Sequence, residues 1–534
     1  MISDNVLLTL PVLIPMLAGV IAFLIPKKRI VQVVFNVASS FILLVSALML
    51  FCAVHGGDIL SITFGGWDAP FGIVFVADIL SAAMVLVTAF IAFVATIYAY
   101  ADIDGRRYRY GFVTFFQFMF CGINGAFLTG DIFNLYVWFE VMLITSFALL
   151  SLGNEKIQLY GTLKYIALNL IATVLFLSAI GMLYGATGTL NMADLAIKLP
   201  LIEDRFLIDI IAVFFIVAFG IKSAVFPLFF WLPASYHLPP VTVSAIFAGL
   251  LTKVGVYALI RIFTLIFTEN YDFTQPILLW IAALTMVVGG LSATIQKNTR
   301  RILSFHIISQ IGYMIMGLAL LTAHALAGAV FYIVHHIIVK ANLFFISGIM
   351  ARKAGGFYIG RMGGLYVAAP FLSFLFIIAA FSLAGFPPLS GFWSKFLVVN
   401  AGLLAGNGWI VLAALIAGML TIISMAKIWV ECFWKPYPGE QEDFGEGLRE
   451  QVQAVKSKTS HSYINIVPPY GKAALYVTCA LLAAVTISIG LAPSYLVDVA
   501  DRASIQLMTP SLYIDAVLTT ESISVIEALS DGEG

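Results

Sequence analysis

Long runs of apolar residues recur along almost the whole chain, separated by short polar loops. An α-helix needs roughly 20 apolar residues to cross a bilayer, because backbone groups in hydrocarbon must satisfy their own hydrogen bonds. The first run lacks a basic start and a small-residue cleavage site, so we expect a retained helix rather than a signal peptide. We predict fourteen spanning helices, at residues 6–25, 30–54, 73–101, 110–129, 131–151, 162–184, 206–230, 241–265, 275–296, 301–322, 325–350, 366–398, 407–433 and 470–493.

Basic residues gather in alternate loops. One set of loops contains Lys27, Lys28, Arg29, Arg106, Arg107, Arg109, Lys156, Lys297, Arg300, Arg301, Arg352, Lys353, Arg361, Lys435, Arg449, Lys456 and Lys458. The other set contains only Lys198, Arg205, Arg261 and Arg502. By the positive-inside rule the first set is cytoplasmic, which predicts that both termini lie outside. The polar stretch from Pro436 to Ser460 is then a cytoplasmic linker, and the residues after Val497 form a loosely held external extension.

Composition agrees with a membrane protein, since 61% of the residues are hydrophobic and only 10% are charged. Soluble domains carry about 25% charged residues. Lys+Arg and Asp+Glu both number 28, so the net charge indicates no nucleic-acid partner. The chain shows no phosphate loop, dinucleotide fingerprint or hydrolase pattern. Its four cysteines lack C-x-x-C spacing, so we expect no metal, haem or iron–sulfur site at Cys52, Cys121, Cys432 and Cys479.

Glu140 lies in the fifth predicted span, within GDIFNLYVWFEVMLITSF. At about 1.5 Å per residue, its place in this helix is near the bilayer midplane. A charge there costs several kcal/mol unless it is paired or hydrated, so we interpret Glu140 as functional. Lys222, just before Pro227 in the seventh span, is the natural partner. The alternatives are a protonated glutamate that hydrogen-bonds between helices and a lysine that extends its ammonium group to the cytoplasmic side.

Lys253 lies about twelve residues into the eighth span, too deep to reach the membrane interface easily. Burial moves the protonation equilibrium of a lysine toward neutral pH, where it exchanges a proton. Lys253 is therefore a candidate relay residue. The alternative is a structural lysine that donates to a backbone carbonyl at a helix break.

His336 and Lys340 are four residues apart in the eleventh span, so their side chains share one helical face. Two neighbouring titratable groups suit stepwise proton transfer. His335 points about 100° away from His336, and we rank it lower as a relay candidate. His306, in the tenth span, is open to a packing role or a relay role.

Lys395 ends a second apolar segment that prolines interrupt, FSLAGFPPLSGFWSKFLVV. Its FPPLSGFW sequence is similar to FPLFFW in the seventh span, and a lysine lies near each break. Paired proline-interrupted spans indicate inverted repeats with a site near the midplane. We predict that residues 106–270 (helices 4–8) and 271–435 (helices 9–13) are the repeats. Residues 1–105 form helices 1–3, and residues 436–534 form the linker, helix 14 and the tail.

Other charged residues lie closer to predicted span ends. Asp78, Asp209 and Lys427 fit anchoring at the membrane interface, and Glu431 fits an acid at the interface. Lys164, at the cytoplasmic start of the sixth span, is a further relay candidate that extends the Glu140 and Lys222 pair, or else an unrelated residue.

Three long motifs resemble one family. The stretches WFEVMLITSFALL, KSAVFPLFFWLPASYHLPPVTVSAIFAGLLTKVGVY and AGFPPLSGFWSK look like the proton-translocating subunits shared by respiratory complex I, membrane hydrogenases and Mrp cation/proton antiporters. The resemblance covers nearly the whole chain. Within the family, the length of the chain and the lysine at position 395, which the resemblance implies is the exit site, are most like those of the D-type Mrp proteins. The related M-type protein of complex I has an acid at that position. The larger A-type Mrp protein has a long C-terminal extension that this chain lacks.

This resemblance implies a role for each buried residue. Glu140 and Lys222 are expected to form a coupled pair, Lys253 to be the central relay, and His336 and Lys340 to bridge two half-channels. It implies a fold of two inverted five-helix repeats flanked by further helices. It also implies a multisubunit membrane complex that exchanges Na+ for H+ without a redox cofactor.

Two other functions remain open at this point. A redox-linked pump component of a quinone reductase or hydrogenase would use the same channel with a different driving reaction. A solitary solute carrier would transport by itself. Proton translocation in a prokaryotic plasma membrane, within an Mrp-type antiporter, is the function that we expect.

Overall fold

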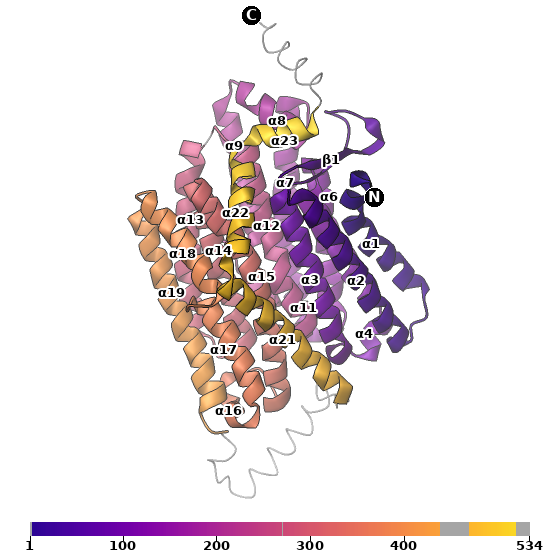
Figure 1. The fold of residues 1–534 in the computed structure, drawn as a ribbon, viewed down its shortest axis with the longest axis vertical. Helices are drawn as coiled ribbons and strands as arrows, with labels where there is room; N and C mark the ends of the chain where they lie inside the picture. Colours follow the sequence, from indigo (N-terminus) through magenta and orange to yellow (C-terminus); the bar gives the residue numbers. More distant parts are fainter. Residues whose placement is uncertain (1–2, 270, 438–468, 519–534) are drawn as a thin grey trace, which may run out of the picture.

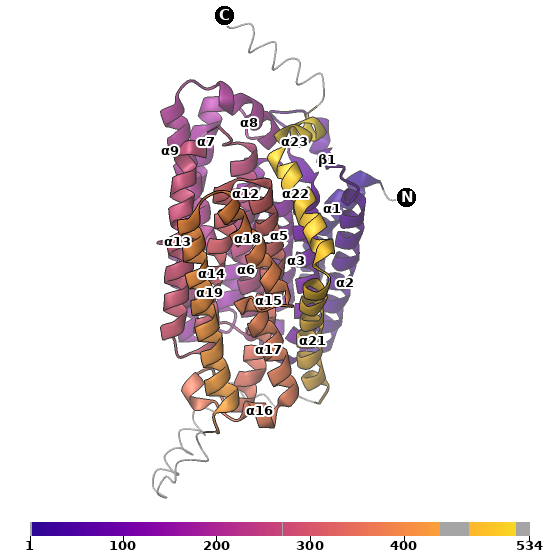
Figure 2. The ribbon, with the colours of Figure 1, turned by 60° about the vertical axis from the view of Figure 1, so that its left-hand side comes forward.

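The computed structural model describes residues 3–269, 271–437 and 469–518, which form a bundle of helices with roughly parallel axes (Figures 1 and 2). Twelve of the described helices are long and apolar enough to cross a membrane. Two shorter apolar helices, Phe112–Leu128 and Pro370–Ala384, accompany them. Each of these helices matches one predicted span. The prediction of an all-α multi-pass membrane protein with about fourteen helices is confirmed.

The first half of the chain contains the following helices: α1 (Asp4–Leu24), α2 (Arg29–Val54), α3 (Ile79–Asp102), α4 (Gly105–Arg109), α5 (Phe112–Leu128), α6 (Ile132–Ser151), α7 (Lys156–Thr187), α8 (Met192–Lys198), α9 (Arg205–Ser223), α10 (Trp231–Ser235), α11 (Val241–Ile246), the π-helical segment η3 (Phe247–Leu251) and α12 (Thr252–Leu265). Two strands, β1 (Leu60–Thr63) and β2 (Val74–Ala77), pair in antiparallel fashion between α2 and α3. Short 3-10 turns lie at Phe64–Gly66 (η1) and Leu199–Leu201 (η2).

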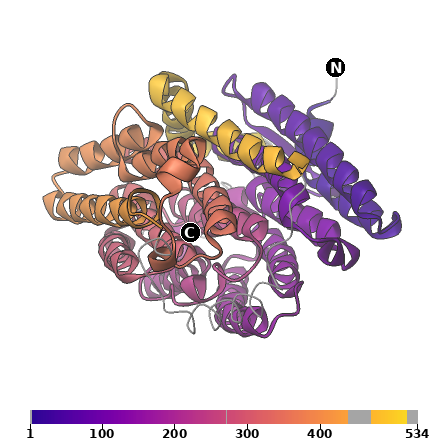
Figure 3. The ribbon, with the colours of Figure 1, turned by 90° about the horizontal axis from the view of Figure 1, so that it is seen from below.

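The second half continues with α13 (Tyr271–Ile295), α14 (Thr299–Leu320), α15 (Ala323–Ala354), the 3-10 turn η4 (Ile359–Arg361), α16 (Leu365–Ala368), α17 (Pro370–Ala384), α18 (Ser390–Leu404), α19 (Gly408–Ile428), the π-helical segment η5 (Trp429–Trp434), α21 (Pro469–Leu491), α22 (Pro493–Met508) and α23 (Pro510–Val517). In the view along the bundle, the indigo helices α1 and α2 and the orange helices lie at opposite edges (Figure 3).

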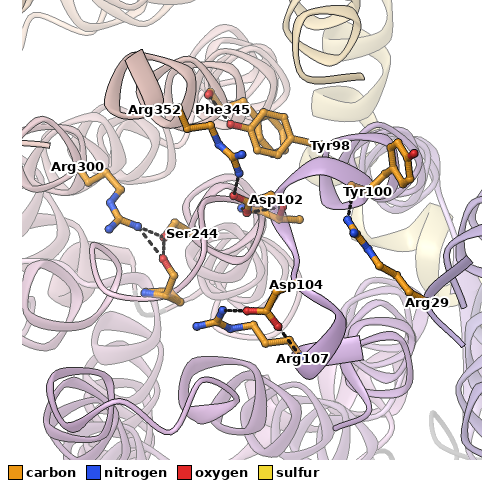
Figure 4. A network of polar contacts seen from close by, with 12 residues as sticks. Arg29, Tyr98, Tyr100, Asp102, Asp104, Arg107, Ser244, Arg300, Phe345 and Arg352 are labelled. Atoms are coloured by element: carbon orange, nitrogen blue, oxygen red, sulfur yellow. Dashed lines mark hydrogen bonds and ion pairs between the residues drawn. The ribbon is translucent and has the colours of Figure 1, made fainter. Parts of the chain in front are cut away.

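The bundle has two distinct ends. We call the lower end in Figure 1, where α4 and α16 lie, the basic end. The name refers to Arg106 and Arg107 of α4, to Arg300 and Arg352 near them (Figure 4), and to Arg361 shortly before α16. The upper end carries the β1–β2 hairpin, α8 and α23, and we call it the hairpin end. Because the helices alternate in direction, α1 begins and α23 ends at the hairpin end (Figure 1).

The core lies along α15 and the α11–η3–α12 segment. Every residue from Ala325 to Ala351 on α15 is buried, and so is every residue from Val241 to Leu265. These two segments pack against each other. The helices that carry Lys253, His336 and Lys340 are therefore the most enclosed part of the described structure.

Two of the predicted spans are interrupted, at the prolines where the sequence indicated a break. The predicted span 206–230 ends as a helix at Ser223, where Ala224 takes a left-handed conformation with φ 62°. The predicted span 366–398 becomes α16, α17 and α18, with Gly385 at φ 95° after α17. Proline lacks a backbone N–H and cannot continue a helix, which accounts for breaks beside Pro227 and Pro387.

The expectation of a loosely held tail after Val497 is wrong for residues 498–517. These residues form most of α22 and all of α23, and α22 packs against α15. Gln506 Oε1 accepts a hydrogen bond from Ile79 N at 3.0 Å, and Gln506 Nε2 donates to Gly57 O at 3.0 Å. Small residues at helical spacing, Ala500 and Ala503, allow close packing. Most of the predicted linker, and the last residues of the tail, lie outside the described residues.

Asp78 and Arg261 form a buried ion pair at the hairpin end, although the sequence indicated an interface anchor and a loop residue. Their side chains are 2% and 6% exposed, respectively. Asp78 also accepts a hydrogen bond from Ser81 N at 2.8 Å and begins α3. The guanidinium of Arg261 lies over the rings of Tyr257 and Tyr513, 5.6 and 5.1 Å from their centroids. The sequence could not show this pair because α3 and α12 are distant in the chain.

We predict that Asp78→Ala lowers the stability of the protein strongly, because it leaves Arg261 buried without a carboxylate. Removing one partner of a buried ion pair costs about 3–5 kcal/mol. The measurement is the fraction of protein that stays monodisperse in mild detergent after heating. The double variant Asp78→Leu/Arg261→Met should recover most of the loss, since it removes both charges; equal melting of Asp78→Ala and the parent would contradict the assignment.

Candidate functional site

Glu140 and Lys222 are joined through a threonine that the sequence analysis missed. Thr173, on α7, donates from Oγ1 to Glu140 Oε1 on α6 at 2.6 Å. Lys222 Nζ, at the end of α9, lies 3.3 Å from Thr173 Oγ1 and 3.5 Å from Asn169 O. Within the described residues, no ion pair within 4.0 Å joins Glu140 to Lys222 directly. The predicted pair is thus bridged by a hydroxyl.

The available sequence signal for this bridge was the spacing of Asn169 and Thr173. They are four residues apart in an apolar helix, and both are buried on the side of α7 that faces the bundle. Their polarity is otherwise unexplained in a membrane span. Which of many such polar residues meets Glu140 depends on helix packing, which one sequence does not reveal.

Lys222 lies in the last turn of a helix that ends inside the bundle. The residue is 5% exposed, and its Nζ lies 5.8 Å from the centroid of the Phe139 ring. The last carbonyls of a helix point outward from its C-terminus and carry partial negative charge, which favours a lysine there. The interruption of α9 therefore provides a reason for a lysine at this depth.

Helices α9 and α12 approach closely beside Lys222. A Cβ atom at Gly255 would lie 2.5 Å from Ser223 Oγ and 2.9 Å from Ser223 N, so only glycine fits. Ser223 is fully buried, and its hydroxyl has no hydrogen-bond partner in the described protein. Ser223 directly follows Lys222, and its hydroxyl lies against α12, the helix that carries Lys253.

Lys253 is held by the π-helical segment that precedes it. Its Nζ donates to Ala248 O at 2.7 Å and lies 3.3 Å from Thr252 Oγ1. A π-helical turn changes the pairing of backbone groups, and such turns occur often at functional sites. The carbonyl contact matches the structural alternative for this lysine. It does not conflict with a relay role, which stays a prediction.

His336 and Lys340 lie in the fully buried part of α15. Both ring nitrogens of His336 lack a hydrogen-bond partner in the described protein, and so does the Nζ of Lys340. Lys253 interacts electrostatically with both residues. Buried polar groups are nearly always hydrogen-bonded, so titratable groups that lack protein partners need an explanation other than packing.

The other two histidines each bond to a serine. His335 Nδ1 lies 2.8 Å from Ser390 Oγ, which in turn lies 3.0 Å from Ser382 Oγ. Because Ser382 and Ser390 flank the break between α17 and α18, His335 connects α15 to that break. His306 Nε2 lies 2.6 Å from Ser424 Oγ on α19. Both histidines have a structural contact, and neither contact tests a relay role.

Two stacked tyrosines fill the space between His336 and Lys395. Lys395 Nζ donates to Ala384 O at 2.9 Å, at the end of α17, and lies 5.5 Å from the centroid of the Tyr313 ring. Tyr313 stacks on Tyr332 with ring centroids 5.2 Å apart, and Tyr332 lies 6.4 Å from the His336 ring. The sequence analysis assigned no role to either tyrosine.

Lys164 is not brought to the Glu140 and Lys222 pair. Its side chain is exposed on α7, where Nζ lies 4.4 Å from the centroid of the Tyr160 ring. Lys164 and Thr173 are nine positions apart, which is half a turn out of phase on an α-helix. The hypothesis that Lys164 extends the pair is wrong for this chain by itself.

Six of the candidates lie on a series of helices that contact one another in turn. Helix α6 packs against α7, α7 against α9, α9 against α12, the η3 segment before α12 against α15, and α15 against α18. We call these six residues the row: Glu140, Lys222, Lys253, His336, Lys340 and Lys395. Between successive members of the row lie hydroxyl side chains, such as Thr173, and the aromatic rings of Tyr313 and Tyr332. Such a row suits transfer of protons between neighbouring groups.

Comparison with known proteins gives a consistent family. The family description "NADH:quinone oxidoreductase/Mrp antiporter, TM" matches residues 129–421, which include every residue of the row. The D-type component of the Na(+)/H(+) antiporter of Alkalihalophilus pseudofirmus is 43% identical over 514 residues, covering 96% of this chain and 99% of the relative.

Solved structures agree. A protein in the Mrp complex from Dietzia sp. superimposes with a TM-score of 0.86 at 29% identity, over 97% of this chain and 100% of its own length. A protein of the archaeal membrane-bound sulfane sulfur reductase gives a TM-score of 0.83 at 26% identity, over 96% and 99%. The fold is thus shared by antiporters and respiratory complexes. This chain belongs to the NADH:quinone oxidoreductase/Mrp antiporter family and, within it, to the D-type proteins of Na+/H+ antiporters.

Proposed function

We propose that this chain is the proton-translocating component of a multisubunit Na+/H+ antiporter in a prokaryotic plasma membrane. The observation that carries the proposal is the row of titratable groups from Glu140 to Lys395, whose four middle members are buried, in a relative of D-type antiporter proteins. The basic end faces the cytoplasm, by the positive-inside rule. Both termini then lie outside. The function is transport rather than covalent catalysis.

Coupling along the row rests on electrostatics at low dielectric. Inside a bundle that excludes water, adding or removing one charge changes the energy of charging its neighbours over several ångströms. Lys253 lies between the Lys222 region on one side and the pair of Lys340 and His336 on the other. Protonation of one group therefore favours release from the next, which moves a proton along the row.

Hydroxyl groups connect some neighbouring members of the row. A threonine or serine hydroxyl both donates and accepts a hydrogen bond, so it connects two titratable groups without holding a charge itself. Thr173 does this between Glu140 and Lys222. Ser223, at the end of α9, lies against Gly255 of α12, and Gly255 is two residues beyond Lys253. Its hydroxyl therefore lies near the interval between Lys222 and Lys253.

The chain works with the other proteins of an Mrp-type complex, which exchanges Na+ for H+. Support comes from the solved relative, which is part of the Mrp complex from Dietzia sp.. We also propose that residues 106–270 and 271–435 are inverted repeats, because each contains one interrupted helix with a lysine beside the break, at Lys222 and Lys395. No redox cofactor is needed in this scheme.

We predict that Lys253→Ala and Glu140→Ala each reduce Na+-driven proton flux to background, because each removes one titratable group from the row. The measurement is proton uptake into proteoliposomes that contain the purified complex and a Na+ gradient. Lys27→Ala is the matched control, since Lys27 lies just beyond the end of α1, where its Nζ donates to Phe23 O in an exposed hydrogen bond. Parent-like flux in both variants would rule out the row as the proton path.

Copurification separates the antiporter from a redox-linked pump. Purification of this chain in mild detergent should yield small membrane proteins as its partners. Recovery of flavin or iron–sulfur proteins in stoichiometric amount would instead assign the chain to a respiratory complex. Transport of Na+ by the isolated chain would contradict the hypothesis that it works within a complex.

We predict that Thr173→Val reduces proton flux about tenfold, which corresponds to about 1.4 kcal/mol, because valine keeps the volume and removes the bridging hydroxyl. Thr173→Ser should retain most of the flux. Ser178→Ala is the control, since Ser178 is exposed on the same helix, where its hydroxyl donates to Val174 O. Equal loss in the serine and valine variants would mean that Thr173 acts through packing.

A further inference from the structure

One carboxylate at the basic end contacts two of the helices that carry the row. Asp102, the last residue of α3, accepts hydrogen bonds at Oδ2 from Thr242 N and from Thr242 Oγ1, both at 2.8 Å. Its Oδ1 accepts from Arg352 Nη2, also at 2.8 Å (Figure 4). The side chain of Asp102 is 6% exposed and that of Arg352 is 25% exposed.

These partners belong to different functional segments. Thr242 is the second residue of α11, which continues through η3 into α12 and Lys253. Arg352 lies in the last turn of α15, which carries His336 and Lys340. Asp102 therefore links the basic-end termini of the two most deeply buried segments.

The contacts suit the electrostatics of both helix ends. The preceding residue, Pro240, provides no side-chain cap for α11, so Asp102 of α3 caps that helix instead. An acidic group is favourable at a helix N-terminus, and a cation is favourable at a C-terminus. Asp102 thus accepts from a free N–H at the start of α11, and Arg352 places a positive charge at the end of α15. The two side chains form one ion pair.

Tyr98, one helical turn earlier on α3, makes a second contact with α15. Its hydroxyl donates to Phe345 O at 2.9 Å, and the two rings lie 4.4 Å apart (Figure 4). A Cβ atom at Gly348 would lie 2.4 Å from Tyr98 Oη and 2.7 Å from Val241 Cγ1. Glycine at this position allows α3, α11 and α15 to meet.

Helix α14 holds the same loop from the other side. Arg300 Nη1 donates to Pro239 O at 2.6 Å, and its guanidinium lies 3.8 Å from the centroid of the Phe357 ring. The start of α11 is therefore fixed by charged residues from two other helices. Asp102 differs from Arg300 because its carboxylate joins α11 directly to Arg352 of α15.

The separation of α11 from α15 determines the surroundings of Lys253. Gly249, in η3, lies against α15, where its Cβ would be 3.5 Å from Ile337 O and 3.7 Å from Ala341 Cβ. Ile337 and Ala341 are the neighbours of His336 and Lys340 in the chain. Ala248, the residue before Gly249, provides the carbonyl that holds Lys253. A shift of α11 along α15 therefore changes the position of Lys253 relative to Lys340.

We propose that Asp102 is a positioning residue for proton transfer, which sets the register between the Lys253 helix and the His336–Lys340 helix by joining Thr242 to Arg352. This inference rests on the proposed function. Asp102 does not exchange the transported proton in this scheme. It acts through the geometry of the row, from the basic end of the bundle.

The test measures Na+-driven proton flux in proteoliposomes that contain the purified complex. Asp102→Ala cuts both links, Arg352→Gln cuts the link to α15, and Thr242→Val removes one of two bonds to α11. We expect losses of about tenfold for Asp102→Ala and Arg352→Gln, and a smaller loss for Thr242→Val. Asp102→Asn should be intermediate, because the amide oxygen still accepts from Thr242.

The double variant Asp102→Ala/Arg352→Gln distinguishes positioning from general stability. If the two residues act as one link, the double variant loses no more flux than Asp102→Ala. Independent, multiplicative losses would overturn the proposal. Should Asp102→Ala fail to accumulate in the membrane, Arg352→Gln and Thr242→Val answer the same question, and parent-like flux in both would also overturn it.

Asp104→Ala is the matched control. Asp104 lies two residues from Asp102, at the same end, but its carboxylate contacts Arg107 and begins the short helix α4 (Figure 4). The proton flux of the Asp104→Ala variant should stay within about twofold of the parent flux. Lys253→Ala is measured alongside: flux lost there but retained in the Asp102 variants refutes only this inference, whereas flux retained in Lys253→Ala refutes the proposed function as well.

Discussion

A lysine that leaves water for the interior of a membrane protein needs a substitute for its hydration shell. Backbone carbonyls are the most abundant acceptors, but within a regular helix they are already occupied. The structure resolves this conflict by interrupting helices. Lys253 donates to Ala248 O at a π-helical turn, and Lys395 donates to Ala384 O at the end of α17. Lys222 lies in the last turn of the interrupted helix α9.

The same constraint links local sequence to function. Irregular turns and helix ends leave carbonyl groups free, and two of these carbonyls, Ala248 O and Ala384 O, accept from lysines of the row on which the proposed transport depends. Around the row, residues 325–351 of α15 and residues 241–265 of the α11–α12 segment are all buried. That covering keeps the dielectric low, so that neighbouring charges influence each other.

The sequence predicted the spans well because hydrocarbon imposes a length and a composition on every crossing helix. It also identified the titratable residues of the row, since a charge within an apolar run is visible without a structure. It did not predict Thr173, Tyr313, Tyr332 or Asp102 as parts of the site. Their importance depends on which faces of distant helices meet, as for α3 with α11. Helix α22 was missed because polar residues separate its apolar positions.

The position of α15 has a consequence for how the protein is made. Translation delivers α15 to the membrane well before α21 and α22, yet both of these later helices pack against it. Until they arrive, the segment that carries His336 and Lys340 lacks part of its final enclosure. A nascent chain must therefore hold two titratable side chains in an incomplete bundle for the time that synthesis of the remaining residues takes. Biogenesis, and not only transport, thus limits how many charges such a helix can carry.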